Sequence, residues 1–122
     1  MDYSALFAKA DAAGKAAANG CQPTPMIVGT AKGFSNEIDF RQPTYFVADG
    51  VCGFAWVSFA GNTAWGRWAK KAKLARSGYP KGLQIWISDY GQSMQLKEAY
   101  ARAFAAVLQD AGIDAYAGSR MD

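Results

Sequence analysis

The sequence predicts an α+β fold: one domain over residues 1–122, with a mixed sheet of four to five strands and helices packed mainly on one face. Three observations support this. The chain has 122 residues, enough to close a single core, and 51% of them are hydrophobic. Segments with helical periodicity lie near both ends and in the middle of the chain. Short apolar or alternating segments, typical of strands, lie between them.

Three segments have the pattern of helices. Residues 3–19 are alanine-rich, and Tyr3, Leu6 and Phe7 fall near one face. A second helix is expected from an Asn62 N-cap to Gly78, with both Trp65 and Trp68 on its buried face and the lysines exposed. The third is the clearest, because an apolar stripe runs along residues 96–111 and a C′ glycine follows at 112.

Strands are expected at 26–29, 44–47, 52–59, 83–88 and 114–117, and 37–40 is a further candidate. In residues 52–59 both the odd- and the even-numbered positions are largely apolar, which is typical of a central strand with two buried faces. Asp49-Gly50 has the composition of a two-residue hairpin turn between 44–47 and 52–59.

The most informative feature for function is a block of positive charge. Residues 50–88 contain six basic and no acidic residues, which makes +6; the rest of the chain, with seven basic and ten acidic residues, sums to −3. Such a block can attract phosphates or an acidic protein surface. The candidate binding residues are Arg67, Lys70, Lys71, Lys73, Arg76 and Lys81.

Two interpretations of the basic helix stay open. Cations with nearby tryptophans are what a nucleic-acid backbone and its bases need. Equally, Trp65 and Trp68 stand at core spacing, and a lysine-rich outer face over a tryptophan core is ordinary in soluble proteins.

A second candidate site joins the loop residues Asp89, Tyr90, Gln92 and Ser93 to Arg120 near the end of the chain. Loops at the carboxyl end of a strand and the start of a helix often hold ligands, and parallel pairing of the last strand beside 83–88 would bring Arg120 to this loop. The ordinary alternative is that Ser93 caps the helix and Asp89 pairs with Arg120 on the surface.

Several chemistries are excluded or disfavoured. The chain has no histidine and two cysteines, so histidine-activated nucleophiles and Cys- or His-rich zinc sites are excluded. We expect Cys21 and Cys52 to be free and partly buried. The carboxylates of Glu37 and Asp39 show no further ligand pattern, so a polar strand face is favoured over a metal site. No cofactor is expected. Without a signal sequence or a long apolar run, a cytosolic location is expected, with no membrane partner.

Several segments resemble a family of small uncharacterised proteins encoded by bacteriophages and prophages. The similarity is strongest over residues 52–122, and it rests on Cys52-Gly53-Phe54-Ala55-Trp56-Val57, Ile85-Trp86-Ile87, Tyr90-Gly91-Gln92-Ser93, Lys97-Glu98-Ala99-Tyr100 and the segment from Gly112 to Asp122, with Pro23-Thr24-Pro25-Met26 earlier in the chain. The resemblance implies the cytoplasm of an infected host bacterium. It carries over no catalytic residue.

These observations predict a non-enzymatic phage accessory protein. We expect it to bind a host protein, as an inhibitor or adaptor that can act against host defence, through the basic helix and neighbouring loops. The alternative is a nucleic-acid-binding protein that uses the same helix. The third interpretation is a small enzyme or ligand-binding protein that uses the loop from Asp89 to Ser93 with Arg120.

Overall fold

The computed structural model describes residues 2–21, 26–29, 44–47, 52–78, 82–91 and 93–121. In chain order its elements are α1 (Tyr3–Gly20), β1 (Met26–Gly29), β2 (Thr44–Val47), β3 (Gly53–Phe59), α2 (Ala64–Lys71), β4 (Arg76–Ser77), β5 (Leu83–Trp86), α3 (Met94–Asp110) and β6 (Ala115–Met121). The expected α+β class is confirmed.

The main sheet has four strands in the order β4-β5-β3-β6. Every neighbouring pair is antiparallel, so the expectation of a mixed sheet was wrong in the direction of its strands. From β3 onward the elements follow a β-α-β-β-α-β order, the connectivity of split β-α-β folds. Strand β3 lies between β5 and β6, which confirms its central place.

Strands β1 and β2 form a separate antiparallel pair, with Met26 opposite Val47. The hairpin expected between 44–47 and 52–59 was therefore wrong, because β2 pairs with β1 and β3 pairs with β5 and β6. The turn residues Asp49 and Gly50 lie outside the described residues, as does the candidate strand at 37–40.

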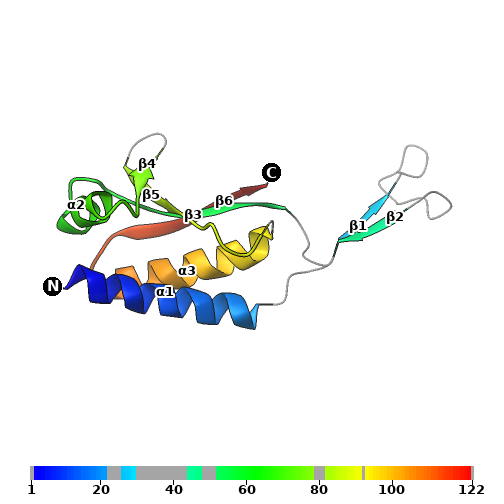
Figure 1. The fold of residues 1–122 in the computed structure, drawn as a ribbon, viewed down its shortest axis with the longest axis horizontal. Coiled ribbons are helices and arrows are strands. Elements are labelled where there is room, and N and C mark those ends of the chain that lie inside the picture. Colours follow the sequence, from blue (N-terminus) through cyan, green and yellow to red (C-terminus); the bar gives the residue numbers. More distant parts are fainter. Residues whose placement is uncertain are drawn as a thin grey trace.

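Helices α1 and α3 lie side by side and cover one face of the main sheet, while α2 lies at the end of the sheet where β3 finishes (Figure 1). Burial alternates along β3, whose residues Ala55, Val57 and Phe59 face the core. As the sequence predicted, α3 packs its apolar stripe on the sheet, and Phe104 and Leu108 are fully buried. No described helix covers the other face of the sheet, which is common for antiparallel sheets.

The ends of α3 follow the predicted chemistry. Ser93 is the N-cap, and its Oγ accepts a hydrogen bond from Leu96 N. Gly112 has a φ of 84°, and the N–H groups of Gly112 and Ile113 donate to the carbonyls of Gln109 and Leu108. These two bonds make a Schellman motif, which ends the helix at the expected place.

Helix α2 is shorter than predicted, and its N-cap is Thr63 rather than Asn62. The helix ends early because Lys73 adopts a left-handed conformation, with a φ of 62°. The N–H groups of Lys73 and Leu74 then donate to Lys70 and Ala69, again as a Schellman motif. Arg76 and Ser77, which were expected in the helix, form β4 instead.

The tryptophans of α2 are placed as the sequence predicted, with one difference. Trp65 is buried and stacks on Trp68 at a ring separation of 5.3 Å, whereas Trp68 is only partly buried. Lys70, Lys71 and Lys73 are exposed. The core interpretation of this helix is therefore confirmed for its inner face.

Candidate functional site

The face of the main sheet that no described helix covers carries an aromatic and basic cluster. The strand register aligns Trp86, Trp56 and Gly118 in one row across the sheet, with Phe54 and Arg120 in the next row. In the opposite direction Gln84, Ser58 and Tyr116 form a further row, which Arg76 of β4 extends. We call this surface the aromatic face; it comprises Phe54, Trp56, Ser58, Arg76, Gln84, Trp86, Tyr116, Gly118 and Arg120.

Three rings form the centre of the aromatic face. The rings of Trp56 and Trp86 are 5.0 Å apart and inclined by 32°, and Phe54 meets Trp86 edge to face at 5.8 Å. All three side chains are partly exposed. The Trp86 Nε1 donates to Gln84 Oε1 at 3.0 Å, and this bond between two side chains of β5 restrains the indole. The cluster is thus an ordered set of flat surfaces that solvent reaches.

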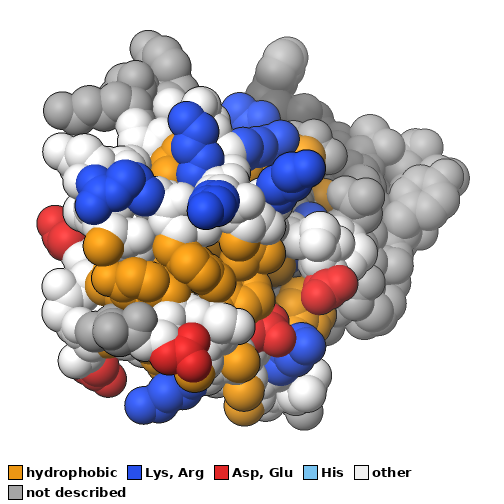
Figure 2. Space-filling model, turned by 60° about the vertical axis from the view of Figure 1, so that its left-hand side comes forward, with side chains coloured by type: hydrophobic (Ala, Val, Ile, Leu, Met, Phe, Trp, Pro, Cys, Tyr) orange, Lys and Arg blue, Asp and Glu red, His pale blue; other side chains and the backbone are white. Residues whose placement is uncertain are grey.

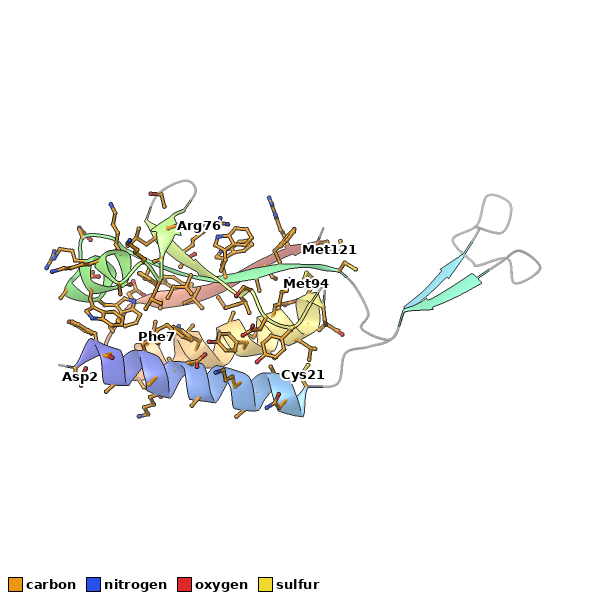
Figure 3. The ribbon with its side chains drawn as sticks, in the orientation of Figure 1. Asp2, Phe7, Cys21, Arg76, Met94 and Met121 are labelled. Carbon is orange, nitrogen blue, oxygen red and sulfur yellow. The ribbon has the colours of Figure 1, made fainter. Side chains whose placement is uncertain are left out.

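Two arginines lie on these rings. The guanidinium of Arg76 is 4.5 Å from the ring centre of Trp86, and that of Arg120 is 5.5 Å from Phe54 and 6.0 Å from Trp86. Figure 3 shows Arg76 on the opposite side of the sheet from Phe7 of α1. A guanidinium that stacks through its plane keeps its N–H edges free for a phosphate or carboxylate. None of the side chains of the aromatic face is acidic.

The strand end beneath Phe54 is held by a buried lysine. Lys97 of α3 is 5% exposed, and its Nζ donates to the Gly53 carbonyl at 3.1 Å. The same ammonium lies 5.4 Å from the Phe54 ring. Lys97 therefore adds positive charge behind the aromatic face and positions the first residues of β3.

An open depression of about 710 Å³ continues the aromatic face toward α2. Ser58 and Tyr116 line it from the sheet, Lys70 lines it from α2, and Asp114 lines it from the chain just before β6. The depression connects the aromatic rows with one cation of the predicted basic helix.

The predicted basic residues are only partly brought together. Arg67, Lys70, Lys71 and Lys73 are exposed on or just after α2, and Figure 2 shows Lys and Arg side chains gathered beside a band of hydrophobic side chains at this end of the molecule. Arg76 belongs to the aromatic face instead. Lys81 lies outside the described residues.

The predicted loop site is divided between the two sides of the sheet. Tyr90 packs against Tyr100 of α3 at 6.0 Å on the helix-covered side, and burial, with the nearby Asp89 charge second, raises the pKa of Tyr90. Arg120 lies on the aromatic face, because β6 pairs with β3 and not with β5. Ser93 is buried as the helix cap, and Gln92 lies outside the described residues. The parallel pairing that would have joined Arg120 to the loop was wrong.

Sequence reasoning missed the aromatic face as a unit. Leu83, Ile85 and Ile87 are buried and alternate with Gln84 and Trp86, so Trp86 lies on the side of the strand away from the core. Because Phe54 and Trp56 are apolar, the sequence predicts that their side of the strand is buried as well. What local patterns do not show is that Arg76 and Arg120 lie on the same side of the sheet as these rings. The strand register shows it.

Within the described ranges, no group of three or more His, Cys, Asp or Glu side chains could hold a metal ion, and no helix is long and apolar enough to cross a membrane. Cys21 and Cys52 are free and partly buried, as expected. Glu37 and Asp39 lie outside the described residues. Comparison of the chain with family models, curated proteins and solved structures finds no match.

Proposed function

We propose that this protein binds single-stranded nucleic acid on the aromatic face. The observation that carries the proposal is the ring cluster of Phe54, Trp56 and Trp86, with Arg76 and Arg120 lying on its rings. Flat exposed rings accept unpaired bases, and each base stacked on an aromatic side chain contributes about 1–3 kcal/mol. The bases of a duplex are already stacked on one another, so a single strand is the form that fits.

The charges of the aromatic face support the same partner. Arg76 and Arg120 offer N–H donors beside the rings, where the phosphates of a stacked strand would run. Lys70 adds a third cation at the edge of the depression. The aromatic face itself has no acidic side chain that would repel the backbone, and Asp114 lines the depression beside it.

The architecture supports the proposal by analogy. Four-stranded sheets that present aromatic side chains on their open face stack two or three bases in a common class of RNA-binding module. Here the three rings come from β3 and β5, the two central strands of the sheet. Connectivity alone does not assign a function, so the proposal depends on the side chains.

Binding to a host protein in an infected bacterium is the second candidate. The exposed cations Arg67, Lys71 and Lys73 lie outside the aromatic face and support it, because they offer a surface for an acidic partner. Trp and Arg are also frequent anchors of protein interfaces, so the aromatic face itself must be tested against both partners.

The test is fluorescence anisotropy with labelled single-stranded DNA, single-stranded RNA and duplex oligonucleotides over a range of salt concentrations. We expect single strands to bind more tightly than duplexes, and Trp86→Leu to weaken that binding by about tenfold or more. Arg76→Gln should weaken it and reduce the log–log salt slope by about 0.7. Arg102→Gln, which changes an exposed arginine of α3, is the matched control.

Two results would overturn the proposal. One is the absence of binding to any oligonucleotide at low salt. The other is a Trp86→Leu variant that binds single strands as well as the parent chain. If instead Trp86→Leu converted a dimer into a monomer, the aromatic face would be an interface between two copies of this chain.

A further inference from the structure

We propose that the depression beside Tyr116 holds one nucleobase that carries an exocyclic amine, with Asp114 as the residue that selects it. This inference depends on the proposed binding of single strands to the aromatic face. It predicts that cytosine is preferred over thymine or uracil at one position of the bound strand. The chemistry is the same for DNA and RNA, since the selecting group contacts the base.

The depression lies where the next nucleotide of a stacked strand would fall. Ser58 lines it and stands two residues beyond Trp56 on the same side of β3, about 7 Å along the strand. Tyr116 is directly opposite Ser58 in the register. A base stacked on Trp56 is therefore followed by one that enters the depression. Its volume of about 710 Å³ leaves room for a base and its sugar.

Tyr116 provides the stacking surface of the depression. Its side chain is 59% exposed although it is large and aromatic, and it lines the depression from β6. Asp114 lines the same depression, and the interaction of its carboxylate with the Tyr116 hydroxyl raises the pKa of Tyr116.

Asp114 provides the selection. A carboxylate accepts hydrogen bonds at both oxygens, so Asp114, which lines the depression with Tyr116, can accept from a base. The N4 amine of cytosine can donate to it, whereas thymine and uracil present the O4 carbonyl at the same place. Two acceptors that face each other repel, and the carbonyl would also lose its water. The carboxylate thus favours one pyrimidine over the other of the same size.

Lys70 explains how an anionic strand can approach this carboxylate. It is exposed and lines the depression from α2, across from the β6 side. Its ammonium can contact the phosphate of the nucleotide whose base meets Asp114. The pair of opposite charges therefore suits a nucleotide, which has a negative backbone and an amine-bearing base edge.

The experiment compares oligo(dC) with oligo(dT), and oligo(C) with oligo(U), at mildly alkaline pH, where cytosine stays unprotonated. For the parent chain we expect the cytosine strand to bind about three- to tenfold more tightly, the effect of one typical hydrogen bond. Asp114→Asn keeps the size of the side chain and one acceptor oxygen, but its amide can also donate to O4. We expect this variant to lose the preference or reverse it.

Asp110→Asn is the matched control, because it removes an exposed carboxylate at the end of α3 that does not line the depression. It should keep the cytosine preference. Tyr116→Leu should weaken binding of both pyrimidine strands and bring their affinities closer together. Circular dichroism confirms that each variant is folded.

The outcomes separate this inference from the proposed function. Equal binding of cytosine and thymine strands by the parent chain would overturn the inference and leave the proposed function standing. An unchanged preference in Asp114→Asn would also overturn it. If neither strand bound the parent chain, the inference and the proposed function would fall together.

Discussion

Gly118 of β6 lies directly across from Trp56 of β3, and the indole occupies the space that a side chain at position 118 would need. A β-carbon on Gly118 would lie 2.5 Å from Nε1 of Trp56, well inside contact distance. The absence of a side chain on one strand therefore decides where the ring of the next strand rests. This relationship gives the first prediction.

Gly118→Val should displace the Trp56 indole and weaken single-strand binding by about tenfold, the effect of losing one stacked base. Anisotropy measures the affinity, and the tryptophan emission spectrum reports the displaced ring. Gly20→Ala is the control, because a β-carbon there meets nothing within 4 Å. An unchanged emission spectrum with normal affinity would contradict the placement of Trp56.

Charge reversal on α2 distinguishes the roles of Lys70 and Lys71, which the sequence analysis assigned to the same basic helix. Lys70→Glu should weaken single-strand binding and reduce the log–log salt slope by about 0.7 or more, because Lys70 lines the depression. Lys71→Glu should have a smaller effect, because Lys71 does not line it. Equal effects of the two reversals would indicate that α2 attracts the strand through its overall electrostatic field and not through a contact of Lys70. If neither reversal had an effect, the lysines of α2 would form an ordinary solvated face.

Phe104→Ala should lower the free energy of unfolding by about 3–5 kcal/mol. Phe104 is fully buried, and its ring meets Phe7 of α1 at 5.5 Å, so its removal leaves a cavity between two helices and the sheet. Urea denaturation measures the loss. A change below about 1 kcal/mol would mean that α3 is peripheral to the core.

The contact between Asp11 and Tyr100 predicts a pH dependence of stability. The Tyr100 hydroxyl donates to the Asp11 carboxylate and, with Lys15 also close by, holds the pKa of Asp11 below its ordinary value of 3.8. A depressed carboxyl pKa contributes stability above the unfolded pKa, and that stability is lost as the pH falls through the folded pKa.

Tyr100→Phe removes the hydrogen bond and keeps the ring. At neutral pH it should lower the free energy of unfolding by about 1–2 kcal/mol, and the difference from the parent chain should shrink below about pH 4. Urea melts at several pH values measure both effects. A difference that stayed constant down to strongly acidic pH would show that the bond does not depend on the charge of Asp11.

Lys73→Gly should stabilise the protein by about 1 kcal/mol, because glycine accepts the left-handed conformation that Lys73 holds at a φ of 62°. Lys71→Gly removes a neighbouring lysine from the last turn of α2 and should instead destabilise by about 0.5–1 kcal/mol. Thermal melts of both variants decide the matter. Destabilisation by Lys73→Gly would mean that the lysine side chain makes a contact more valuable than the strain it carries.

Local patterns in the sequence predicted the helices well. The spacing of apolar residues along α3 and the glycine at 112 determined its face and its end, because both signals act within a few residues. The same logic failed at Lys73, where a lysine ends a helix without the glycine that usually marks the place. The expected end at Gly78 followed from composition, whereas the actual end follows from two backbone hydrogen bonds.

The aromatic face could not be predicted from local patterns, because it is a product of pairing between distant strands. Trp56, Trp86 and Arg120 come from three strands, and only the register makes them neighbours. Alternate residues of β3 are apolar on both sides of the strand, which indicated two buried faces. One side packs on helices, whereas Phe54 and Trp56 on the other side meet Trp86 and Arg120. An exposed apolar face has the same sequence pattern as a buried one, so the two are distinguished only when the packing of the helices on the sheet is known.

The pairing of β3 with β6 also has a consequence for the speed of folding. This ladder joins Phe59 to Ala115 and Gly53 to Met121, so α2, β4, β5 and α3 all lie within the loop that it closes. Closing so long a loop costs chain entropy before any of the ladder's contacts form. Contacts between residues far apart in the sequence slow folding, and the β3–β5 pair, which spans a shorter loop, should form first. Substitutions at the β3–β6 ladder, such as Ala117→Gly, should therefore mainly accelerate unfolding and leave the folding rate nearly unchanged.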